Sequence, residues 1–516
     1  MASDLHDKPM ATVHEELTGG LGRAVYFRAK RMLVRSFLNQ QDAKVVIADH
    51  HEYPLHDVSM NGLSFFVPTS EQRWEPGAVL DFAVVVQDRS AFHADDKLAS
   101  AAFREAVFRG RGRIARADET PVATHIGVQL LDGFLNLPQL QWNFAERMLR
   151  RDLDGGPAAI RDRVPPAYRE IVEHLAFFLQ FYKQSLNRHE ERYAEMGDEG
   201  QDAIRHRAPQ AALESLRAPW YALRERAAQA ILPYVDTPAA FRAAKRYTET
   251  VLTPLMLECP FVHRAYTKPL GYAGDYETML QIYRNTFEGA SVFARVFHKL
   301  GCEEILAAGV RTRKVFIEQA HEAEYTRFVN SSPAGTPFRV TSLGAGPARE
   351  VAAFLDQRAT WPRPVHWTLI DQEEEALSLA YHDLFPRTAN TNPSRTMRCM
   401  YMSFMQFLAD PSSTLSDEPQ DFIYSVGLFD YIQEKRGRMI VRALYDRLAP
   451  GGFLAIANAL RPNTHFWYAE LLLDWTLLYR TRDDMLALAG DLPPDVERQV
   501  AVEPSNAFYF LVVRKP

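Results

Sequence analysis

The chain has 516 residues, of which 47% are hydrophobic and 24% are charged, and its formal net charge is -6. This composition is typical of a folded globular protein, and the length predicts about three domains. The small negative charge excludes a strong electrostatic attraction to nucleic acid or to an anionic membrane. Three scattered cysteines do not provide a disulfide framework or a zinc site, so we expect no metal. The N-terminus lacks the apolar core of a signal peptide, and we expect a cytoplasmic protein without a transmembrane segment.

The first region, residues 15–135, predicts a small β-barrel. Short β-branched and aromatic runs occur at residues 43–47, 63–67, 80–86 and 126–130. Turn residues such as those at 61–62 separate the runs. Many short strands at this spacing are typical of a barrel or a sandwich.

A set of polar residues in this region has the chemistry of a guanine nucleotide site. Arg31 and Arg35 can bind guanine edges and phosphates bidentately, and Asp57 and Ser59 can hydrogen-bond a guanine. The pattern R-x-x-x-R followed by D-x-S-x-x-G resembles the PilZ domain. The resemblance implies that these four residues and Gly62 bind cyclic di-GMP. The alternative is a barrel that only docks against the rest of the chain.

The second region, residues 136–330, predicts helices, because apolar residues recur at intervals of three and four in 168–182, 220–232 and 239–257. The segment 263–277, between two helices, contains three tyrosines, two glycines and a proline. Tyrosine faces attract cations, and the glycines permit a loop that closes over a site. We therefore expect a lid over a substrate or cofactor here. The alternative is a helix–helix connection with surface tyrosines.

The third region, residues 331–516, alternates strands with helices. Candidate strands are 338–343, 366–370, 397–402, 421–425, 453–457 and 508–513. This alternation predicts a mostly parallel sheet with helices on both faces. The expected fold class is therefore multidomain: a β-barrel, a helical region and an α/β Rossmann-like domain.

A glycine turn, Gly344-Ala-Gly-Pro347, follows the first strand of the third region. Such a turn lets backbone N–H groups approach a ligand, and Asp371 at the end of the second strand can accept both hydroxyls of a ribose. A dinucleotide fingerprint needs a third glycine, but Arg349 occupies that position, and the proline removes an N–H donor. The turn therefore suits a nucleoside ligand without a pyrophosphate.

The whole region resembles the class I S-adenosylmethionine-dependent methyltransferases. The resemblance rests on the glycine turn, on Asp371, and on the segments 401–404, 421–430, 448–454 and 508–513. It implies S-adenosyl-L-methionine as the cofactor. One departure is Ser342, which stands where the family usually has an acid for the cofactor's amino group, and Asp275 of the lid is the proposed replacement. The expected cofactor-binding residues are Gly344, Ala345, Gly346, Asp371, Gln372, Ser403, Phe404, Gly427 and Asp275.

The lid and the segment 474–480 resemble bacterial 3-hydroxypalmitic acid methyl ester biosynthesis proteins, which are quorum-signal methyltransferases. The resemblance implies a fatty-acid carboxylate as the acceptor. A carboxylate is ionised at neutral pH, so no general base is needed, and catalysis consists of positioning and desolvation. A cation or a tyrosine hydroxyl would orient the carboxylate. The candidate catalytic residues are Arg264, Tyr272, Tyr276, Tyr479 and Arg480.

Two other functions stay open. The same fold can direct the cofactor's own carboxypropyl arm to react, as in a cyclase or carboxypropyl-transfer enzyme that releases methylthioadenosine. The chain can also be a non-catalytic, nucleotide-sensing interaction protein. An apolar tunnel beside Gly427 and Trp475 would favour the fatty acid, whereas a closed aromatic box would favour cyclisation. Cyclic di-GMP, if it binds, would regulate activity through the lid or the helices.

Overall fold

The computed structural model describes residues 32–33, 43–47, 51–68, 74–86, 106, 108–119, 123–139, 142, 145–146, 149, 160–358, 360–409, 418–461 and 465–516. The chain forms two compact units, Met1–Gly155 and Gly156–Pro516. None of the helices in the described part combines the length and the apolar character that crossing a bilayer requires.

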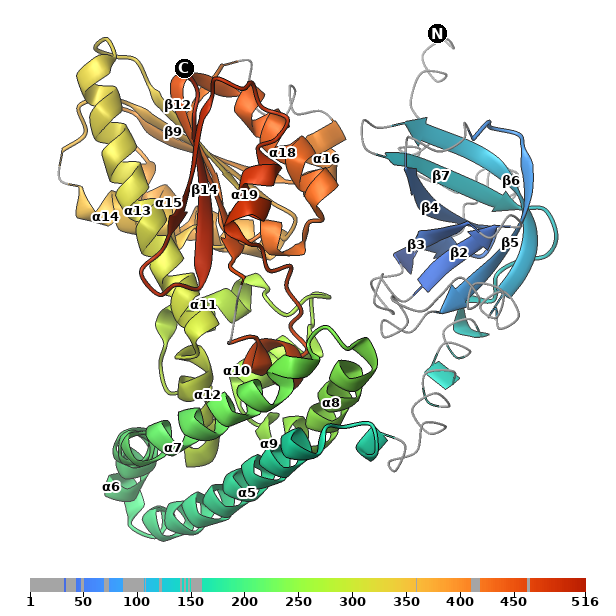
Figure 1. The fold of residues 1–516 in the computed structure, drawn as a ribbon. Coiled ribbons are helices and arrows are strands. Elements are labelled where there is room, and N and C mark those ends of the chain that lie inside the picture. The colour runs from blue at the N-terminus through green and yellow to red at the C-terminus, as the bar shows by residue number, and fades with distance from the viewer. Residues whose placement is uncertain are drawn as a thin grey trace, which may run out of the picture. The chain divides into compact units, whose positions relative to one another are not determined.

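The first unit contains an antiparallel barrel (Figure 1). Its strand order is β1-β3-β2-β5-β6-β7-β4, and an additional pairing between β3 and β4 closes the ring. Alternate apolar side chains such as Leu55, Phe65 and Val128 fill the interior. The predicted barrel is confirmed. The strands are β1 (Met32–Leu33), β2 (Ala43–Ile47), β3 (Glu52–Ser59), β4 (Gly62–Pro68), β5 (Val79–Val86), β6 (Phe108–Glu119) and β7 (Ala123–Leu130).

The second unit begins with helices, as the periodicity predicts. In α5, the residues Tyr168, Ile171, Leu175 and Leu179 recur at three- and four-residue intervals and are buried on one face. The helices are α5 (Pro166–Ala194), α6 (Gly197–Asp202), α7 (Ala208–Ile231), α8 (Pro238–Val251), α9 (Thr253–Met256), α10 (Pro260–Thr267), α11 (Tyr276–Arg284), α12 (Val292–Cys302) and α13 (Ile305–Ser331).

A seven-stranded sheet follows, in the order β10-β9-β8-β11-β12-β14-β13. Strands β8 to β12 pair in parallel, whereas β14 runs antiparallel to β12 and to β13. The sequence does not predict β13, whose alternation of exposed and covered residues is that of a short edge strand. The strands are β8 (Phe338–Leu343), β9 (Val365–Asp371), β10 (Arg395–Tyr401), β11 (Gln420–Ser425), β12 (Leu448–Ala459), β13 (Glu497–Val502) and β14 (Phe508–Arg514).

Helices cover both faces of this sheet, with α13 and α14 on one side and α18 and α19 on the other (Figure 1). Strand β8 pairs with β9 on one side and with β11 on the other, so the direction of winding reverses beside β8. Ligands of doubly wound sheets bind at such a switch point, outside the carboxyl ends of the strands. The helices are α14 (Arg349–Gln357), α15 (Glu374–Thr388), α16 (Phe404–Ala409), α18 (Glu434–Asp446) and α19 (Arg482–Leu488).

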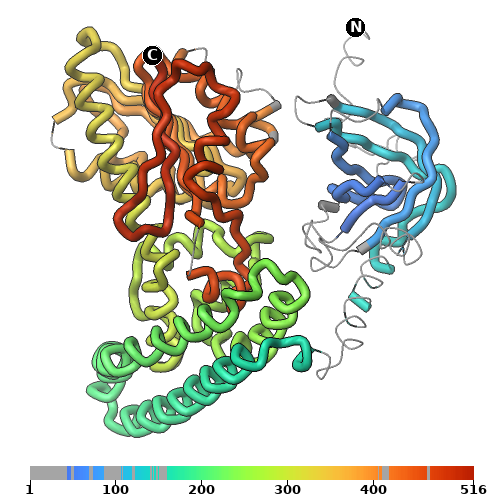
Figure 2. The backbone as a smooth tube through the Cα atoms, in the orientation of Figure 1, coloured from blue at the N-terminus to red at the C-terminus, as the bar shows by residue number. Residues whose placement is uncertain are grey.

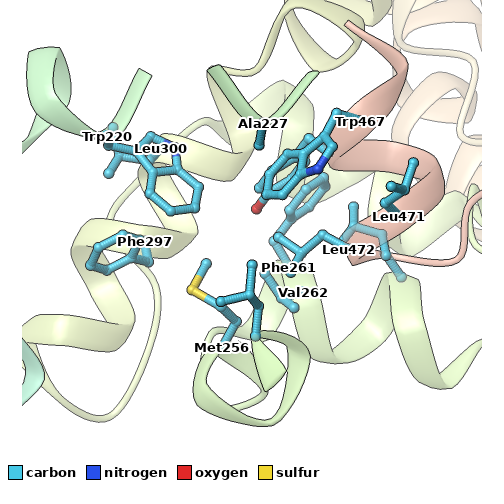
Figure 3. Close-up of a cluster of buried hydrophobic side chains, with 14 of the residues drawn as sticks. Trp220, Ala227, Met256, Phe261, Val262, Phe297, Leu300, Trp467, Leu471 and Leu472 are labelled. Atoms are coloured by element: carbon cyan, nitrogen blue, oxygen red, sulfur yellow. The ribbon is translucent and has the colours of Figure 1, made fainter. Parts of the chain in front are cut away.

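One hydrophobic cluster joins the helical region to the α/β region. The chain after β12 runs into the helices (Figure 2), where Trp467, Leu471 and Leu472 lie among side chains that include Met256 and Phe261 (Figure 3). The two regions therefore stabilise each other within the second unit.

A buried hydrogen-bond chain fixes this insertion. Trp467 Nε1 donates to Tyr168 Oη at 2.7 Å, and Tyr168 Oη lies 2.6 Å from Thr248 Oγ1. Burial raises the pKa of Tyr168 far above the neutral range, so the hydroxyl keeps its proton. One phenol thus connects α5, α8 and the chain that follows β12.

We expect Tyr168→Phe to lower the free energy of unfolding by about 1–3 kcal/mol, because it leaves the buried Trp467 N–H without an acceptor. Urea unfolding measures the change. Tyr381→Phe is the matched control, since the Tyr381 side chain is 42% exposed, and it should change the stability little. Equal stability of Tyr168→Phe and the wild type would contradict the role given to this hydrogen-bond chain.

Candidate functional site

The glycine turn after β8 has the left-handed backbone that glycine allows. Gly344 has a φ of 72° and Gly346 a φ of 52°. The N–H groups of Gly344 and Ala345 donate to Ile370 O at 2.8 and 3.0 Å. The turn is thereby tied to the end of β9.

Asp371 completes this connection from the last position of β9. Its Oδ2 accepts the Gly346 N–H at 2.7 Å, and its Oδ1 accepts the Glu373 N–H at 2.9 Å. Burial raises the pKa of the Asp371 carboxyl, and these backbone hydrogen bonds oppose the rise. The Gln372 N–H is a third backbone donor to this carboxylate. A carboxylate has about four lone-pair sites, so acceptor capacity remains for a ligand hydroxyl.

The loop after β11 packs against the same turn. A Cβ at Gly344 would lie 3.4 Å from Leu428 Cβ, and a Cβ at Gly427 would lie 3.5 Å from Arg313 Nη2. Gly344 and Gly427 are therefore neighbours at the carboxyl ends of β8 and β11. This is the switch point of the sheet.

The predicted residues after the second and third strands of the α/β region follow β9 and β10. Gln372 directly follows β9 and is half-buried, and Phe404 begins α16. Ser403 caps that helix, because its Oγ accepts the Gln406 N–H at 3.3 Å while its own N–H donates to Gln406 Oε1 at 2.8 Å. The cap fixes the backbone beside the end of β10.

The lid connects α10 to α11 and is held by a partly buried ion pair. Asp275 is the N-cap of α11 and accepts the Thr278 N–H at 2.9 Å. Arg264 Nε donates to both carboxylate oxygens of Asp275, at 2.8 and 2.9 Å. Asp275 thus already binds donors of the lid itself, and its predicted contact with a cofactor amino group stays a prediction.

One tyrosine of the lid bonds the α/β region directly. Tyr276 Oη donates to Glu375 Oε2 at 2.6 Å, and Glu375 lies in the first turn of α15. This hydrogen bond raises the pKa of Tyr276 to about 12. Because α15 follows Asp371, the bond brings the lid next to the end of β9.

Tyr272 lies near the same carboxylates. Burial, followed by the charges of Glu373 and Asp371, raises the pKa of the Tyr272 hydroxyl, so it stays protonated. Its ring meets the ring of Tyr431 edge-on, with 6.4 Å between the centroids. The lid therefore extends from the end of β9 to the loop after β11.

Gly274 allows the lid to approach two aromatic side chains. Trp475 Nε1 donates to Tyr431 Oη at 2.8 Å. A Cβ at Gly274 would lie 2.6 Å from Tyr431 Oη and 2.7 Å from Trp475 Cζ2, closer than real side chains pack. Close approach, rather than an unusual backbone angle, requires this glycine.

Two lysines hold the segment that begins at Asp474. Lys245 of α8 and Lys268 at the end of α10 both form ion pairs with the Asp474 carboxylate. Burial alone would raise the pKa of Asp474, but the two ammonium groups hold it below its usual value. The segment is thereby anchored to the helices and to the base of the lid.

Arg480 is buried at 5% exposure and is bonded to the chain itself. Its Nη1 donates to Phe429 O at 2.7 Å and to the side chain of Asn458, and its Nη2 donates to Ile432 O. To orient an acceptor, Arg480 would have to break these bonds. Its neighbour Tyr479 interacts with Glu470, and burial raises the pKa of the Tyr479 hydroxyl.

Sequence reasoning missed Arg313 of α13. It stands in a polar stretch that reads as a solvated helix face, yet the side chain is only 6% exposed. The sequence carries no signal for this burial, because the covering residues come from α11, the loop after β11 and β14.

In the barrel, Arg31 and Arg35 lie outside the described residues. Ser59 Oγ donates to Asn61 Oδ1 at 3.0 Å and to Gly62 O at 3.3 Å, which holds the turn after β3. A Cβ at Gly62 would lie 2.3 Å from Val128 O, so the pairing of β4 with β7 by itself requires glycine there.

A group with metal-ligand spacing lies beside this turn. Ligand atoms of His56, Asp57 and His125 all lie within 4.8 Å of one another, the one such group in the part of the chain that the structure describes. Burial, followed by the charge of Arg116, lowers the pKa of His125 to about 4. The imidazole is therefore neutral and able to bind a metal, whereas the Arg116 charge opposes a cation. The expectation of no metal considered only the cysteines.

No protein-family model matches this chain, and no curated protein matches it. Among similar solved structures is a possible exported protein from Bordetella parapertussis, with 19% identity over 51% of this chain and 88% of that chain and a TM-score of 0.36. Magnesium protoporphyrin IX methyltransferase from Synechocystis PCC 6803 with bound S-adenosylmethionine has 10% identity over 40% of this chain and 83% of that chain, with a TM-score of 0.27. The N-methyltransferase NodS from Bradyrhizobium japonicum WM9 in complex with S-adenosyl-L-homocysteine has 16% identity over 38% of this chain and 87% of that chain, with a TM-score of 0.26. These similarities assign neither a family nor a substrate to this chain.

We expect Gly274→Ala to displace the lid, because the new methyl group overlaps Tyr431 and Trp475. The free energy of unfolding should fall by about 1–3 kcal/mol, and chymotrypsin should cleave at Tyr272 faster than in the wild type. Gly271→Ala is the control in the same loop, since a Cβ there meets open space and only the backbone φ of 90° is strained. Equal cleavage rates at Tyr272 in the two variants would contradict the packing argument.

Proposed function

We propose that this chain is an S-adenosylmethionine-dependent methyltransferase. The observation that carries the proposal is the position of Asp371, at the end of β9 with its carboxylate on the Gly346 N–H. The switch point is where doubly wound sheets bind nucleotides, and the remaining acceptor capacity of Asp371 suits a ribose hydroxyl. Arg349 in place of a third glycine favours a nucleoside without a pyrophosphate.

The lid supports a cationic cofactor. Tyr272 lies near Asp371 and its ring meets that of Tyr431. Aromatic faces attract a cation such as a sulfonium with little desolvation cost. The bond from Tyr276 to Glu375 holds the lid against α15. When bound, S-adenosylmethionine supplies an electrophilic methyl group.

We propose a fatty-acid carboxylate, a 3-hydroxy acid, as the acceptor and a methyl ester signal as the product. The ionised carboxylate is itself the nucleophile, so the chain only has to position and desolvate it. Among the candidate orienting groups, Arg264 and Arg480 donate to the chain's own oxygens. Tyr276 likewise donates to Glu375, and Tyr479 interacts with Glu470. Tyr272 therefore is the better candidate for contact with the acceptor.

A second candidate function is a reaction of the cofactor's own carboxypropyl arm. The contact of Gly274 with Tyr431 and Trp475 favours it, because this contact surrounds the site with aromatic side chains. A cofactor that is bent inside such an enclosure can react with itself and release methylthioadenosine.

Mass spectrometry of the products tests these proposals. The protein is incubated with S-adenosylmethionine and a pool of hydroxylated fatty acids. We expect S-adenosylhomocysteine together with a fatty-acid methyl ester. Methylthioadenosine instead would establish the second candidate, and an unchanged cofactor would contradict both enzymatic functions.

We also expect Asp371→Asn to weaken S-adenosylmethionine binding about 10- to 150-fold, because charge-assisted hydrogen bonding to the ribose is lost. Isothermal titration calorimetry measures the dissociation constant. Glu374→Ala is the control, since Glu374 is an exposed carboxylate three residues away. Unchanged affinity in Asp371→Asn would refute the ribose assignment.

We also propose that the barrel binds cyclic di-GMP through Arg31, Arg35, Asp57 and Ser59. The support is the position of Asp57 and Ser59, which end β3 beside the turn that Ser59 holds. Replacing both arginines by alanine should abolish binding in a calorimetric titration, because the two guanidinium groups supply the phosphate and guanine contacts. The circular dichroism spectrum should not change. A wild type that binds no cyclic di-GMP would contradict the proposal.

A further inference from the structure

Arg313 is a buried cation that lacks close hydrogen-bond acceptors. A guanidinium carries five N–H donors. The nearest carboxylate oxygen, Asp430 Oδ2, lies 3.6 Å from Nη1, which is too long for a hydrogen bond. Nη2 points to the sulfur of Met279 at 3.7 Å, and Nε is buried without a partner.

The surroundings do not supply the missing acceptors. Asp430 is held elsewhere, because its Oδ1 accepts the Ala459 N–H at 2.6 Å and its backbone O accepts the Leu478 N–H at 2.8 Å. The ring of Phe508 covers one face of the guanidinium, with Cζ 4.6 Å from the ring centroid. The N–H groups at the edge of the guanidinium remain for another partner.

An arginine in this state indicates a ligand. Buried polar groups of folded proteins are nearly always hydrogen-bonded, and the exceptions often mark a bound ion or ligand. Burying a charge without hydrogen bonds costs free energy, and a bound ligand that accepts hydrogen bonds would offset this cost. Arg264 and Arg480 show the usual arrangement, since each donates to oxygens of the chain.

The position of Arg313 places these donors at the switch point. Its Nη2 is the atom that a Cβ at Gly427 would meet, at 3.5 Å. Gly427 is not among the glycines with a positive φ, so the backbone does not require glycine there. A Cβ there would make an ordinary van der Waals contact with Nη2, so the backbone at Gly427 lies directly beside the guanidinium. Asp371 of β9 bonds the glycine turn, and Arg313 of α13 lies beside Gly427 in the neighbouring loop after β11.

We infer that Arg313 binds the carboxylate of a ligand in this site. The planar guanidinium matches a carboxylate bidentately. The inference rests on the proposed function, which offers two carboxylates: that of the cofactor's amino acid tail and that of the fatty-acid acceptor. Both present the same chemistry to Arg313, and binding experiments distinguish them.

Calorimetric titrations of the wild type and Arg313→Gln test the inference with ligand pairs that differ in the carboxylate. The first pair is S-adenosylmethionine and its decarboxylated analogue. The second pair, titrated in the presence of S-adenosylhomocysteine, is 3-hydroxytetradecanoic acid and its primary amide. In one of the two pairs, we expect Arg313→Gln to weaken binding of the ligand that has the carboxylate about 10- to 100-fold. The affinity for the ligand without the carboxylate should stay nearly unchanged. The pair that responds identifies the source of the carboxylate.

Arg311→Gln is the matched control on the same helix. Arg311 Nη1 donates to Ile282 O at 3.1 Å and to Cys302 O at 2.6 Å, so its substitution should leave the ratio within each pair unchanged. Arg313→Lys keeps the charge without the bidentate geometry, so it should lose less affinity for the carboxylate ligand than Arg313→Gln. It replaces Arg313→Gln in these titrations if that variant does not fold.

Equal losses for both members of each pair would overturn the inference, because Arg313 would then only support the fold. That result would leave the proposed function intact if the wild type binds S-adenosylmethionine. A wild type that binds neither S-adenosylmethionine nor the fatty acid would instead overturn the proposed function and this inference together.

Discussion

The site depends on the insertion of the chain after β12 into the helical core. Trp467 and its neighbours pack among the helices, and the Tyr168 hydroxyl fixes the tryptophan through a buried hydrogen bond. The same segment then returns to the sheet through Trp475, which contacts Gly274 of the lid, and through Arg480, which holds the loop after β11. A core contact thus sets the distance between the lid and the ends of the strands. This is why the helices and the sheet form one unit.

The charged residues around the site follow from the cost of burial. Two cations near the site are satisfied internally: Arg264 by Asp275, and Arg480 by backbone oxygens and Asn458. Such pairs fix geometry, because breaking one leaves the other charge buried without a partner. Arg313 differs from them, because it lacks close acceptors and lies beside Gly427. This contrast is the reason for inferring a ligand at Arg313.

The alternation of elements and the glycine turn could be predicted from the sequence, because these signals are local. Gly344 and Asp371 each end a strand in a continuous pattern, and the parallel pairing of β8 with β9 brings them together. Arg313 could not be found, since its burial comes from α11, the loop after β11 and β14, which meet only in the folded chain. The group formed by His56 and His125 could not be predicted either, because β3 and β7 are distant in sequence. The need for glycine at Gly62 was predicted for a ligand, whereas the barrel's own pairing already requires it.

The proposed site has a polarity that a ligand would have to match. Asp371 gives its β9 side a carboxylate, and Arg313 gives the side beyond β11 a guanidinium. The charge of Asp371 reaches Tyr272, whose ring meets Tyr431, and Tyr431 follows Asp430, the residue facing Arg313. Aromatic rings thus connect an acceptor-rich end with a donor-rich end. A ligand with hydroxyls at one end, a carboxylate at the other and a positive charge between them fits this order, because each of its groups then meets the side chains that compensate its desolvation.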